Sequence, residues 1–521
     1  MISIADLTFR YPGSSRCALR DVNLDIALGE FVVVTGPSGS GKSTLALAIG
    51  GYLFRQYDGE ATGVVLVNGM DVRRAPIYDV AQVVGLVQQN PEKQFCTLTV
   101  QDEVAFGLEN RCLPRETIRD RIAWALEIVD AGPLRDRSLA TLSGGEKQKI
   151  AIAAMMATKP SVLIFDEPTS NLDPSATAEV FKVIEHIRER AQITVIVIEH
   201  KLDYLRPFEP RVIEMEDGRV SELANQRLAT KGCTESARYG VSSSSRLSVS
   251  PSPCHPDPLS PCPLVRVKDL HVGYNGQPVL HNISLEIHPG EFVAVLGDNG
   301  SGKTTFLQSL LGLLKPKRGR VEVLGHDTRH TPVSELAQRV GFVFQNPDHQ
   351  LFADSVWEEA IFAPHNFGTL DEATEAQAEA LLERCGLGQR QADHPYRLSY
   401  GEKCRLNLIS VLTYDPKLIL LDEVLIGQDA ANAAFLMDLL RERVERGSTV
   451  VMVNHNPEIT QRYASRVIFF KAGRAVVDAP TGEVFRQLAS LGLSAYLPAH
   501  RASDYLMSES PYETANYVPA R

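Results

Sequence analysis

The chain has 521 residues, of which 44% are hydrophobic and 22% are charged, as in ordinary globular proteins. One hydrophobic core cannot organise so long a chain, so we expect two or more domains. The net charge of −11, from 53 basic and 64 acidic residues, argues against non-specific nucleic-acid binding and a polybasic membrane anchor. No apolar run reaches the ~18 residues that a membrane-spanning helix needs, and the first residues lack a secretory signal pattern.

In chain order, the first predicted elements are strands. The run "VNLDIALGEFVVV" (22–34) alternates apolar and polar residues, which predicts an antiparallel piece. Short β-branched runs such as "FVVVTG" and "TVIVIEH" then alternate with longer helical patterns. This alternation predicts an α/β fold with a buried, mostly parallel sheet.

The same sequence motifs recur in the second half of the chain. "GEFVVVTGPSGSGKSTL" (29–45) returns as "GEFVAVLGDNGSGKTTF" (290–306), and "VLIFDEPTSNLD" (162–173) returns as "LILLDEVLIGQD" (418–429). Lys42 and Lys303 are 303 − 42 = 261 positions apart, and Asp166 and Asp422 are 422 − 166 = 256 apart. Two homologous domains with one motif order therefore follow.

The predicted boundaries place the first domain at 1–225, a linker at 226–264, the second domain at 265–490 and a C-terminal tail at 491–521. The linker is rich in Ser and Pro and has no helical or strand period, so we expect it to be flexible. Fully stretched, residues 232–264 reach on the order of 100 Å. Such a linker tethers the domains without fixing how they face each other.

Two stretches match the phosphate-loop pattern G-x-x-x-x-G-K-[ST], each between an apolar strand and a helical pattern. The glycines let backbone N–H groups surround phosphate oxygens, and the following helix adds its positive dipole end. Lysine would reach the β- and γ-phosphates, and the hydroxyl after it would hold Mg²⁺. A Gly-rich turn without a ligand is the alternative for a single match. The candidate residues are Gly36, Pro37, Ser38, Gly39, Ser40, Gly41, Lys42, Ser43 and Thr44, and Gly297, Asp298, Asn299, Gly300, Ser301, Gly302, Lys303, Thr304 and Thr305.

Acid pairs end the apolar runs "VLIFDE" and "LILLDE". Such pairs emerge at the carboxyl edge of a parallel sheet, where ligands bind. We expect Asp166 and Asp422 to coordinate Mg²⁺, and Glu167 and Glu423 to orient or deprotonate the attacking water. By themselves, these acids could equally begin a solvated loop.

The order of phosphate loop, Gln, "LSGGE" (142–146) or "LSYGE" (398–402), acid pair and His resembles the ATP-binding cassette family in both halves. The resemblance implies two P-loop domains, each with a mixed sheet, an antiparallel β subdomain and a helical signature subdomain. It implies that ATP is hydrolysed with Mg²⁺. It also assigns roles to further residues: Gln89 and Gln345 at the metal, His200 and His455 at the γ-phosphate, and Tyr11 and Tyr274 at adenine.

In this family two cassettes sandwich two ATP molecules head to tail, each between one phosphate loop and the opposite signature. We define site one as Lys42, Gln89, Asp166, Glu167 and His200 with Ser399 and Gly401. Site two is Lys303, Gln345, Asp422, Glu423 and His455 with Ser143 and Gly145.

Tyr400 replaces the first signature glycine in site one. It keeps a backbone N–H, and its ring can point away, so only a required positive φ would penalise it. Both candidate bases are present, so we expect both sites to bind and hydrolyse ATP. A slow site one is the competing hypothesis, because "VLI" (424–426) replaces "PTS" and Asn454 replaces Glu199.

The words "QNPEKQF" and "EVAFGLEN", and "QNPDHQLF" and "EAIFAPHN", resemble energy-coupling-factor (ECF) importers of vitamins, vitamin precursors, cobalt or nickel. The resemblance implies a transmembrane coupling subunit and a membrane substrate-binding subunit, with this chain peripheral on the cytoplasmic face of the membrane. Tandem cassettes that act on ribosomes are the alternative. Those carry a charged helical linker, whereas this linker is Ser/Pro-rich and the chain is acidic, which argues against RNA binding.

Overall fold

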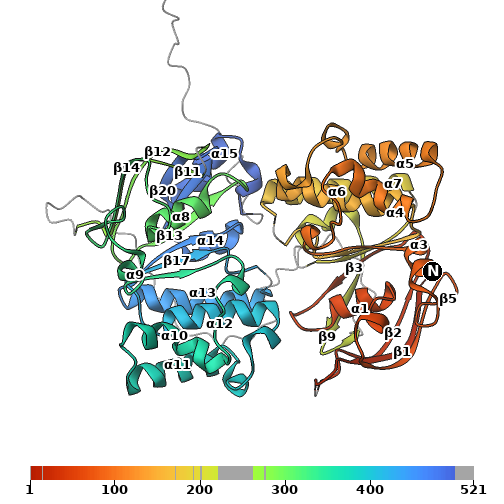
Figure 1. The fold of residues 1–521 in the computed structure, drawn as a ribbon, viewed down its shortest axis with the longest axis horizontal. Coiled ribbons are helices and arrows are strands. Elements are labelled where there is room, and N and C mark those ends of the chain that lie inside the picture. The colour runs from red at the N-terminus through yellow and green to blue at the C-terminus, as the bar shows by residue number, and fades with distance from the viewer. Residues whose placement is uncertain are drawn as a thin grey trace, which may run out of the picture.

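The computed structural model describes residues 2–14, 16–170, 172–191, 193–199, 202–220, 262–274, 277–426 and 428–498. Nearly all of the expected linker, most of the expected tail and His200 lie outside these residues. Figure 1 shows the two halves side by side, the first in red to yellow and the second in green to blue. Each half contains a four-stranded and a six-stranded sheet, as the repeat predicts.

The strands of the first half are β1 (Ile2–Arg10), β2 (Leu19–Ile26), β3 (Phe31–Thr35), β4 (Glu60–Val67), β5 (Met70–Asp71), β6 (Val84–Val87), β7 (Val162–Asp166), β8 (Thr194–Ile198), β9 (Arg211–Glu216) and β10 (Arg219–Val220). Its helices are α1 (Lys42–Ile49), α2 (Leu53–Gln56), α3 (Ile77–Val83), α4 (Val100–Glu109), α5 (Arg115–Ile128), α6 (Gly144–Ala157) and α7 (Pro174–Ala191).

The strands of the second half are β11 (Val265–Tyr274), β12 (Gln277–Ile287), β13 (Phe292–Gly297), β14 (Arg318–Val323), β15 (His326–Asp327), β16 (Val340–Val343), β17 (Leu418–Asp422), β18 (Thr449–Val453), β19 (Arg466–Lys471) and β20 (Arg474–Pro480). Its helices are α8 (Lys303–Leu311), α9 (Val333–Leu336), α10 (Val356–Phe367), α11 (Glu372–Arg384), α12 (Tyr400–Leu412), α13 (Ala430–Glu445), α14 (Pro457–Tyr463) and α15 (Thr481–Ser490), followed by the 3₁₀ turn η10 (Ser494–Tyr496).

The six-stranded sheets place the sequence motifs at one edge. Their orders are β10-β9-β3-β8-β7-β6 and β16-β17-β18-β13-β19-β20. Five strands of each run parallel, and β10 and β20 add antiparallel edges. The phosphate loop follows β3 or β13, the acid pair ends β7 or β17, and the glutamine follows β6 or β16. Because parallel strands end at one edge, these motifs lie together there.

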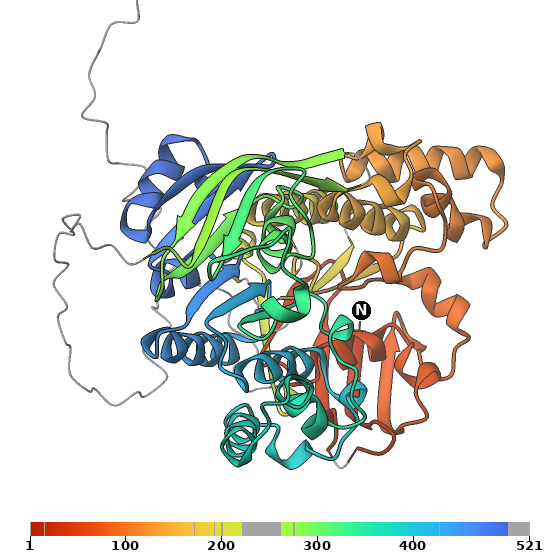
Figure 2. The ribbon, with the colours of Figure 1, turned by 60° about the vertical axis from the view of Figure 1, so that its left-hand side comes forward.

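The antiparallel sheets have the orders β2-β1-β4-β5 and β12-β11-β14-β15. Figure 2 shows the second of them in green, beside the blue strands of its mixed sheet. The prediction of one antiparallel piece over 22–34 was wrong in part, since this run forms two strands in different sheets. The chain turns after β2 through Gly29, whose φ is +74°, and continues as the parallel strand β3.

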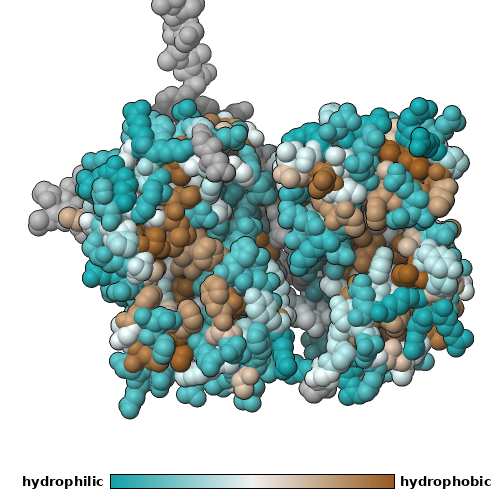
Figure 3. Space-filling view, in the orientation of Figure 1, coloured by the Kyte–Doolittle hydropathy of each residue, from teal (hydrophilic) through white to brown (hydrophobic). Residues whose placement is uncertain are grey.

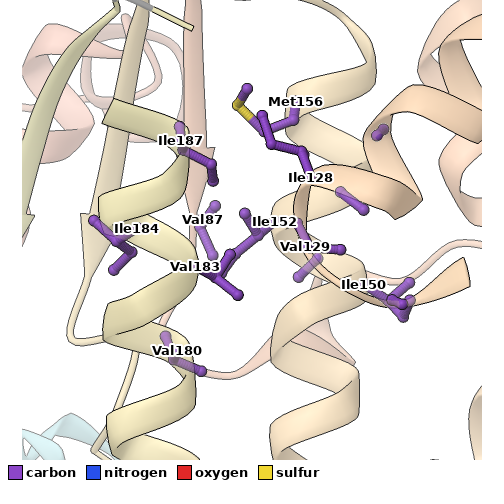
Figure 4. Packing of buried hydrophobic residues seen from close by; sticks show 14 of the residues in the cluster. Val87, Ile128, Val129, Ile150, Ile152, Met156, Val180, Val183, Ile184 and Ile187 are labelled. Carbon is purple, nitrogen blue, oxygen red and sulfur yellow. The ribbon is translucent and has the colours of Figure 1, made fainter. Parts of the chain in front are cut away.

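A layer of helices covers one face of each mixed sheet. In the first half α4, α5, α6 and α7 pack there, and their buried aliphatic side chains continue those of the sheet. Figure 4 shows Val183 of α7 and Ile152 of α6 pointing toward each other, with Val87 of β6 beside them. Helix α6 of this layer begins at the signature motif.

The second core extends beyond the expected boundary at 490. Tyr496 and Leu497 are buried with strands β19 and β20 and with α15, although the sequence analysis assigns them to the tail. The Tyr496 ring meets Phe469 edge to face at 4.8 Å between centroids. The signal missed in the sequence was the pair of large hydrophobic residues, Tyr496 and Leu497, that follows α15. The turn η10 also contacts α7 of the first half.

Candidate functional site

Both phosphate loops have a backbone that only glycine accommodates. Gly36 and Gly297 have φ values of +140° and +141°. A Cβ on Gly36 would lie 2.0 Å from the Met215 carbonyl oxygen, and one on Gly297 would lie 2.1 Å from that of Phe470. Such approaches are sterically forbidden. The two loops therefore share one geometry, which turns the chain from the strand into helices α1 and α8.

The loop lysines are buried cations whose ammonium groups donate hydrogen bonds to loop carbonyl oxygens. Lys42 and Lys303 are each 5% exposed. The Lys42 ammonium donates to the carbonyl oxygens of Gly36 at 2.9 Å and Pro37 at 2.8 Å, and Lys303 makes the equivalent bonds at 2.8 and 2.9 Å. Burial lowers the pKa of both lysines. An anion at the loop would compensate this cost of burial.

Two buried hydroxyls also fit an oxygen-rich ligand. Among the described residues, Ser40 Oγ and Ser301 Oγ are buried atoms without a hydrogen-bond partner. A buried polar atom left unpaired costs free energy, so equivalent atoms in both loops point to a common ligand. With the buried lysine and the glycine cradle, these residues fit a phosphate chain.

The acid at the end of each strand lies against the hydroxyl that follows the lysine. Ser43 Oγ donates to Asp166 Oδ1 at 3.0 Å. In the second half, Thr304 is the hydroxyl that acts to lower the pKa of Asp422, whose Oδ1 is a buried atom without a hydrogen-bond partner among the described residues. Burial first, and the neighbouring glutamate second, raise the pKa of Asp166 and of Asp422 to about 6. A carboxylate paired with a hydroxyl beside a phosphate loop fits Mg²⁺, which prefers such oxygen ligands.

The neighbouring glutamates are bound to the predicted glutamines. Gln89 Nε2 donates to Glu167 Oε2 at 3.1 Å, and Gln345 Nε2 donates to Glu423 Oε2 at 2.7 Å. Both glutamates have positive φ values, +47° and +55°, a conformation that non-glycine residues seldom adopt outside functional sites. The repeat therefore preserves the side chains and also the unusual backbone that aims them.

In the second half, histidine completes this group. His455 Nε2 lies 2.6 Å from Glu423 Oε1. Burial raises the pKa of Glu423, but His455, Lys303 and Gln345 together lower it more, so the net shift is downward. Glu423 is thus held as a carboxylate, the form that can orient or accept a proton from water. The equivalent His200 lies outside the described residues.

The signature motifs are helix N-termini. Ser143 caps α6 and Ser399 caps α12, each in a capping box with the glutamate three residues later. Glu402 is further held by Arg390, at 2.9 Å from Nη1 to both carboxylate oxygens. The "E" of each signature is therefore a structural cap, while the Ser-x-Gly backbone occupies the positive end of the helix dipole.

The two halves contact each other through equivalent aspartates, and these contacts were not predicted from the sequence. Asp173 Oδ2 accepts from the Asn299 backbone N–H at 2.8 Å, and Asp429 Oδ2 accepts from that of Ser38 at 3.1 Å. Each aspartate thus reaches the opposite phosphate loop. The signal was present in "NLD" and "GQD", which follow the acid pair in both halves.

The signatures lie close to these contacts. A Cβ on Gly144 would be 3.8 Å from Asn299 Nδ2 of the second half. Gln428, next to Asp429, donates from Nε2 to the Gly401 carbonyl oxygen at 2.9 Å. This arrangement is the one that a head-to-tail pair of cassettes requires. Direct nucleotide contacts by Ser143, Gly145, Ser399 and Gly401 stay a prediction.

The two tyrosines predicted to stack on adenine contact the first turn of the helix that follows each phosphate loop. The Tyr11 hydroxyl is 3.2 Å from Thr44 Oγ1, and its ring meets that of Tyr57 edge to face. The Tyr274 hydroxyl donates to Gln308 Oε1 at 2.9 Å and lies 3.5 Å from Thr305 Oγ1. Both rings therefore lie beside their phosphate loop, and the stacking role stays a prediction.

Comparisons with known proteins agree with this geometry. The family described as "ABC transporter" matches residues 19–170 and 280–425. An ABC transporter ATP-binding protein of Methanosarcina acetivorans, so named provisionally, is 36% identical across 96% of this chain and 90% of its own length. A protein of Caldanaerobacter subterraneus with the same kind of provisional name is 35% identical across 93% of this chain and 92% of its own.

This chain therefore belongs to the ABC transporter family, and it is an ATPase subunit with two ATP-binding cassettes. A Bacillus subtilis protein, provisionally named HMP/thiamine import ATP-binding protein YkoD, is 32% identical across 94% of this chain and 93% of its own length. Among solved structures, cbiO1 of Clostridium perfringens aligns with 45% of this chain and 98% of its own, at 30% identity and a TM-score of 0.39. The family match in both halves and the relatives that span both cassettes confirm the resemblance to the cassette family.

Proposed function

We propose that this chain is the energy-coupling ATPase of an ECF-type importer that takes up a vitamin, a vitamin precursor, cobalt or nickel. The observation that carries the proposal is the match over both cassettes to a protein named for HMP/thiamine import. Among the described residues, no helix is long and apolar enough to cross a membrane. Transport by this subunit would thus use separate membrane proteins.

In the proposed sites, each phosphate loop binds one ATP, and the opposite signature closes over it. Lys42 and Lys303 bind phosphate oxygens, and Glu167 and Glu423 orient the attacking water. Asp166 with Ser43, and Asp422 with Thr304, would hold Mg²⁺, with Gln89 and Gln345 beside them. When bound, Mg²⁺ neutralises charge that develops on the phosphates. The cross-half contacts of Asp173 and Asp429 support this pairing.

The proposed docking face for the membrane coupling subunit follows each glutamine. There, a buried glutamate holds a short loop by its backbone: Glu103 accepts from the N–H groups of Cys96 and Thr97, each at 3.0 Å. Glu359 accepts from Phe352 and Ala353 at 2.8 and 2.9 Å. These rigid loops present large apolar side chains to the surface.

Two of these side chains are among the most exposed large hydrophobic residues of the described chain. Leu98 is 83% exposed and Phe352 is 70% exposed. Phe362 on α10 lies next to Phe352, with 6.2 Å between ring centroids. Figure 3 shows hydrophobic residues gathered over the lower part of the second half, where Figure 1 places α10 and α11. Exposed apolar groups on a fixed backbone favour docking of an apolar partner surface.

A tagged full-length chain, isolated from its own cells, tests the proposal. We expect it to cofractionate with membranes and to copurify with two very hydrophobic proteins. The double variant Leu98→Asp/Phe352→Asp should lose this association yet keep ATP binding. Leu28→Asp, a control in the turn between β2 and β3 where leucine is 67% exposed, should retain it. Cofractionation with ribosomes, or membrane association that ignores the double variant, would contradict the proposal.

A further inference from the structure

Tyr400, the residue that departs from the first half's signature, is accommodated without backbone strain. It is the first residue of α12, directly after the cap Ser399. It is absent from the residues with positive φ, and so is its counterpart Gly144. The position therefore does not require glycine, and a tyrosine costs no conformational strain there. Its side chain is free to take another role.

The Tyr400 side chain reaches into the other site. Its hydroxyl donates to the Gln345 backbone carbonyl oxygen at 3.1 Å. Gln345 in turn donates from its side chain to Glu423, and Glu423 is bound to His455. Hydrogen bonds to the backbone and from the side chain of Gln345 thus link the signature helix α12 to the candidate base of site two.

The first half has no counterpart of this connection. Gly144 occupies the equivalent position and has no side chain, although Gln89 and Glu167 make the same bond as Gln345 and Glu423. At this place the halves therefore differ by one phenol group, which lies between the signature and the glutamine loop of the second half.

We propose that Tyr400 is a positioning residue that couples the two ATP sites: its backbone belongs to the signature that closes site one, and its hydroxyl holds Gln345 in site two. This inference rests on the proposed pairing of signatures with opposite phosphate loops. Nucleotide in site one engages the first turn of α12, and the phenol transmits the position of that turn to the backbone at Gln345. Glu423 is then aimed according to the occupancy of site one. Coupling of the two binding equilibria is reciprocal.

Single-site variants of the full-length chain separate this role from a local one. With Glu167→Gln, only site two retains its candidate base, and with Glu423→Gln, only site one does. We expect Tyr400→Phe to lower kcat about two- to tenfold in the Glu167→Gln background, the range that one neutral hydrogen bond supplies. KM should change little there. In the Glu423→Gln background Tyr400→Phe should leave kcat unchanged, because the ring and the backbone N–H remain. A loss confined to site one, equal losses or no loss would overturn the proposal.

A binding measurement decides the matter even if residual turnover is too slow to compare. In the Glu167→Gln/Glu423→Gln variant, a fluorescent ATP analogue should bind with a Hill coefficient above 1, which Tyr400→Phe lowers toward 1. Tyr396→Phe removes the hydroxyl of a neighbouring exposed tyrosine whose ring lies under the Lys403 ammonium, and it is the matched control. A Hill coefficient of 1 in the parent, or one that Tyr400→Phe leaves unchanged, overturns the coupling. Absence of any nucleotide binding would instead refute the proposed sites themselves.

Discussion

The two cassettes share their phosphate-binding groups and differ in what surrounds them. In the first half the Thr169 hydroxyl is bonded to the buried carboxylate of Glu199. In the second half Leu425 and Asn454 take these positions, and Asn454 instead donates to the Thr460 hydroxyl at 3.3 Å. The hydroxyl and the carboxylate have been replaced together, so that neither half keeps one partner of the pair alone.

The second site is the more extensively anchored of the two. Tyr400 holds Gln345, and the Tyr496 hydroxyl donates to Asp298 Oδ1 of the phosphate loop at 2.6 Å. The first half has Gly144 and Pro37 at the equivalent positions, and neither offers the polar side chain that such a bond needs. Duplication thus preserved the chemistry of both sites, while the groups that fix their positions diverged.

The largest expected effect comes from the candidate bases. Removing both, in Glu167→Gln/Glu423→Gln, should lower ATP turnover at least about 100-fold, because water activation is lost at both sites. Each single variant should keep measurable turnover. Steady-state phosphate release measures all three. Equal losses in the single variants would show that the groups that differ between the halves do not affect turnover, and turnover retained in the double variant would contradict both roles.

The paired aspartates predict a pH effect that is alike in both halves. Since the pKa of Asp166 and Asp422 is raised to about 6, the folded state binds their protons more tightly than the unfolded state does. The resulting penalty is full above pH ~6 and disappears toward pH ~4, so acidification over this range should stabilise the protein.

We expect on the order of 3 kcal/mol per carboxyl, measured by urea unfolding without Mg²⁺ or nucleotide. Asp166→Asn and Asp422→Asn should each remove about half of this dependence. A stability that falls between pH 6 and pH 5 in the parent chain would contradict the prediction.

The cross-half contacts should also behave alike. Asp173→Ala and Asp429→Ala each remove a charge-assisted bond of about 1.5–3 kcal/mol. Because these bonds join the halves at the phosphate loops, we expect the KM for ATP to rise about tenfold in each variant. Asp173→Asn, which keeps an acceptor oxygen, should show a smaller rise. An unchanged KM in either alanine variant would show that its contact does not support nucleotide binding.

The smallest effect is expected at the C-terminal anchor. Tyr496→Phe removes the bond to Asp298 but keeps the ring against Phe469, so it should cost about 1 kcal/mol. Calorimetry should show a shift of about 2–4 °C in Tm. Tyr57→Phe, an exposed site in the first half, is the control. A Tm that does not move would remove this anchor from the comparison.

Much of the site follows from sequence because its motifs depend on local geometry. The phosphate loops need glycine where φ is positive, and a lysine and a hydroxyl must follow at fixed spacing, as Gly36, Lys42 and Ser43 do. The predictions were wrong where the same residue pattern is compatible with two different structural surroundings. The alternation over 22–34 continues through a turn, so it could not reveal that β2 and β3 belong to different sheets. The burial of Tyr496 depends on a surface that β19 and α15 create.

The repeat and the motifs already indicate two cassettes and the residues at each phosphate loop, because strand ends and glycine turns are encoded locally. Which groups meet across the halves became known from the packing of the folded chain. Asp173 with Asn299, and Asp429 with Ser38, lie 126 and 391 positions apart. That packing also decided where the Tyr400 phenol points. Such contacts depend on how separate elements pack in space, and no local spacing records that.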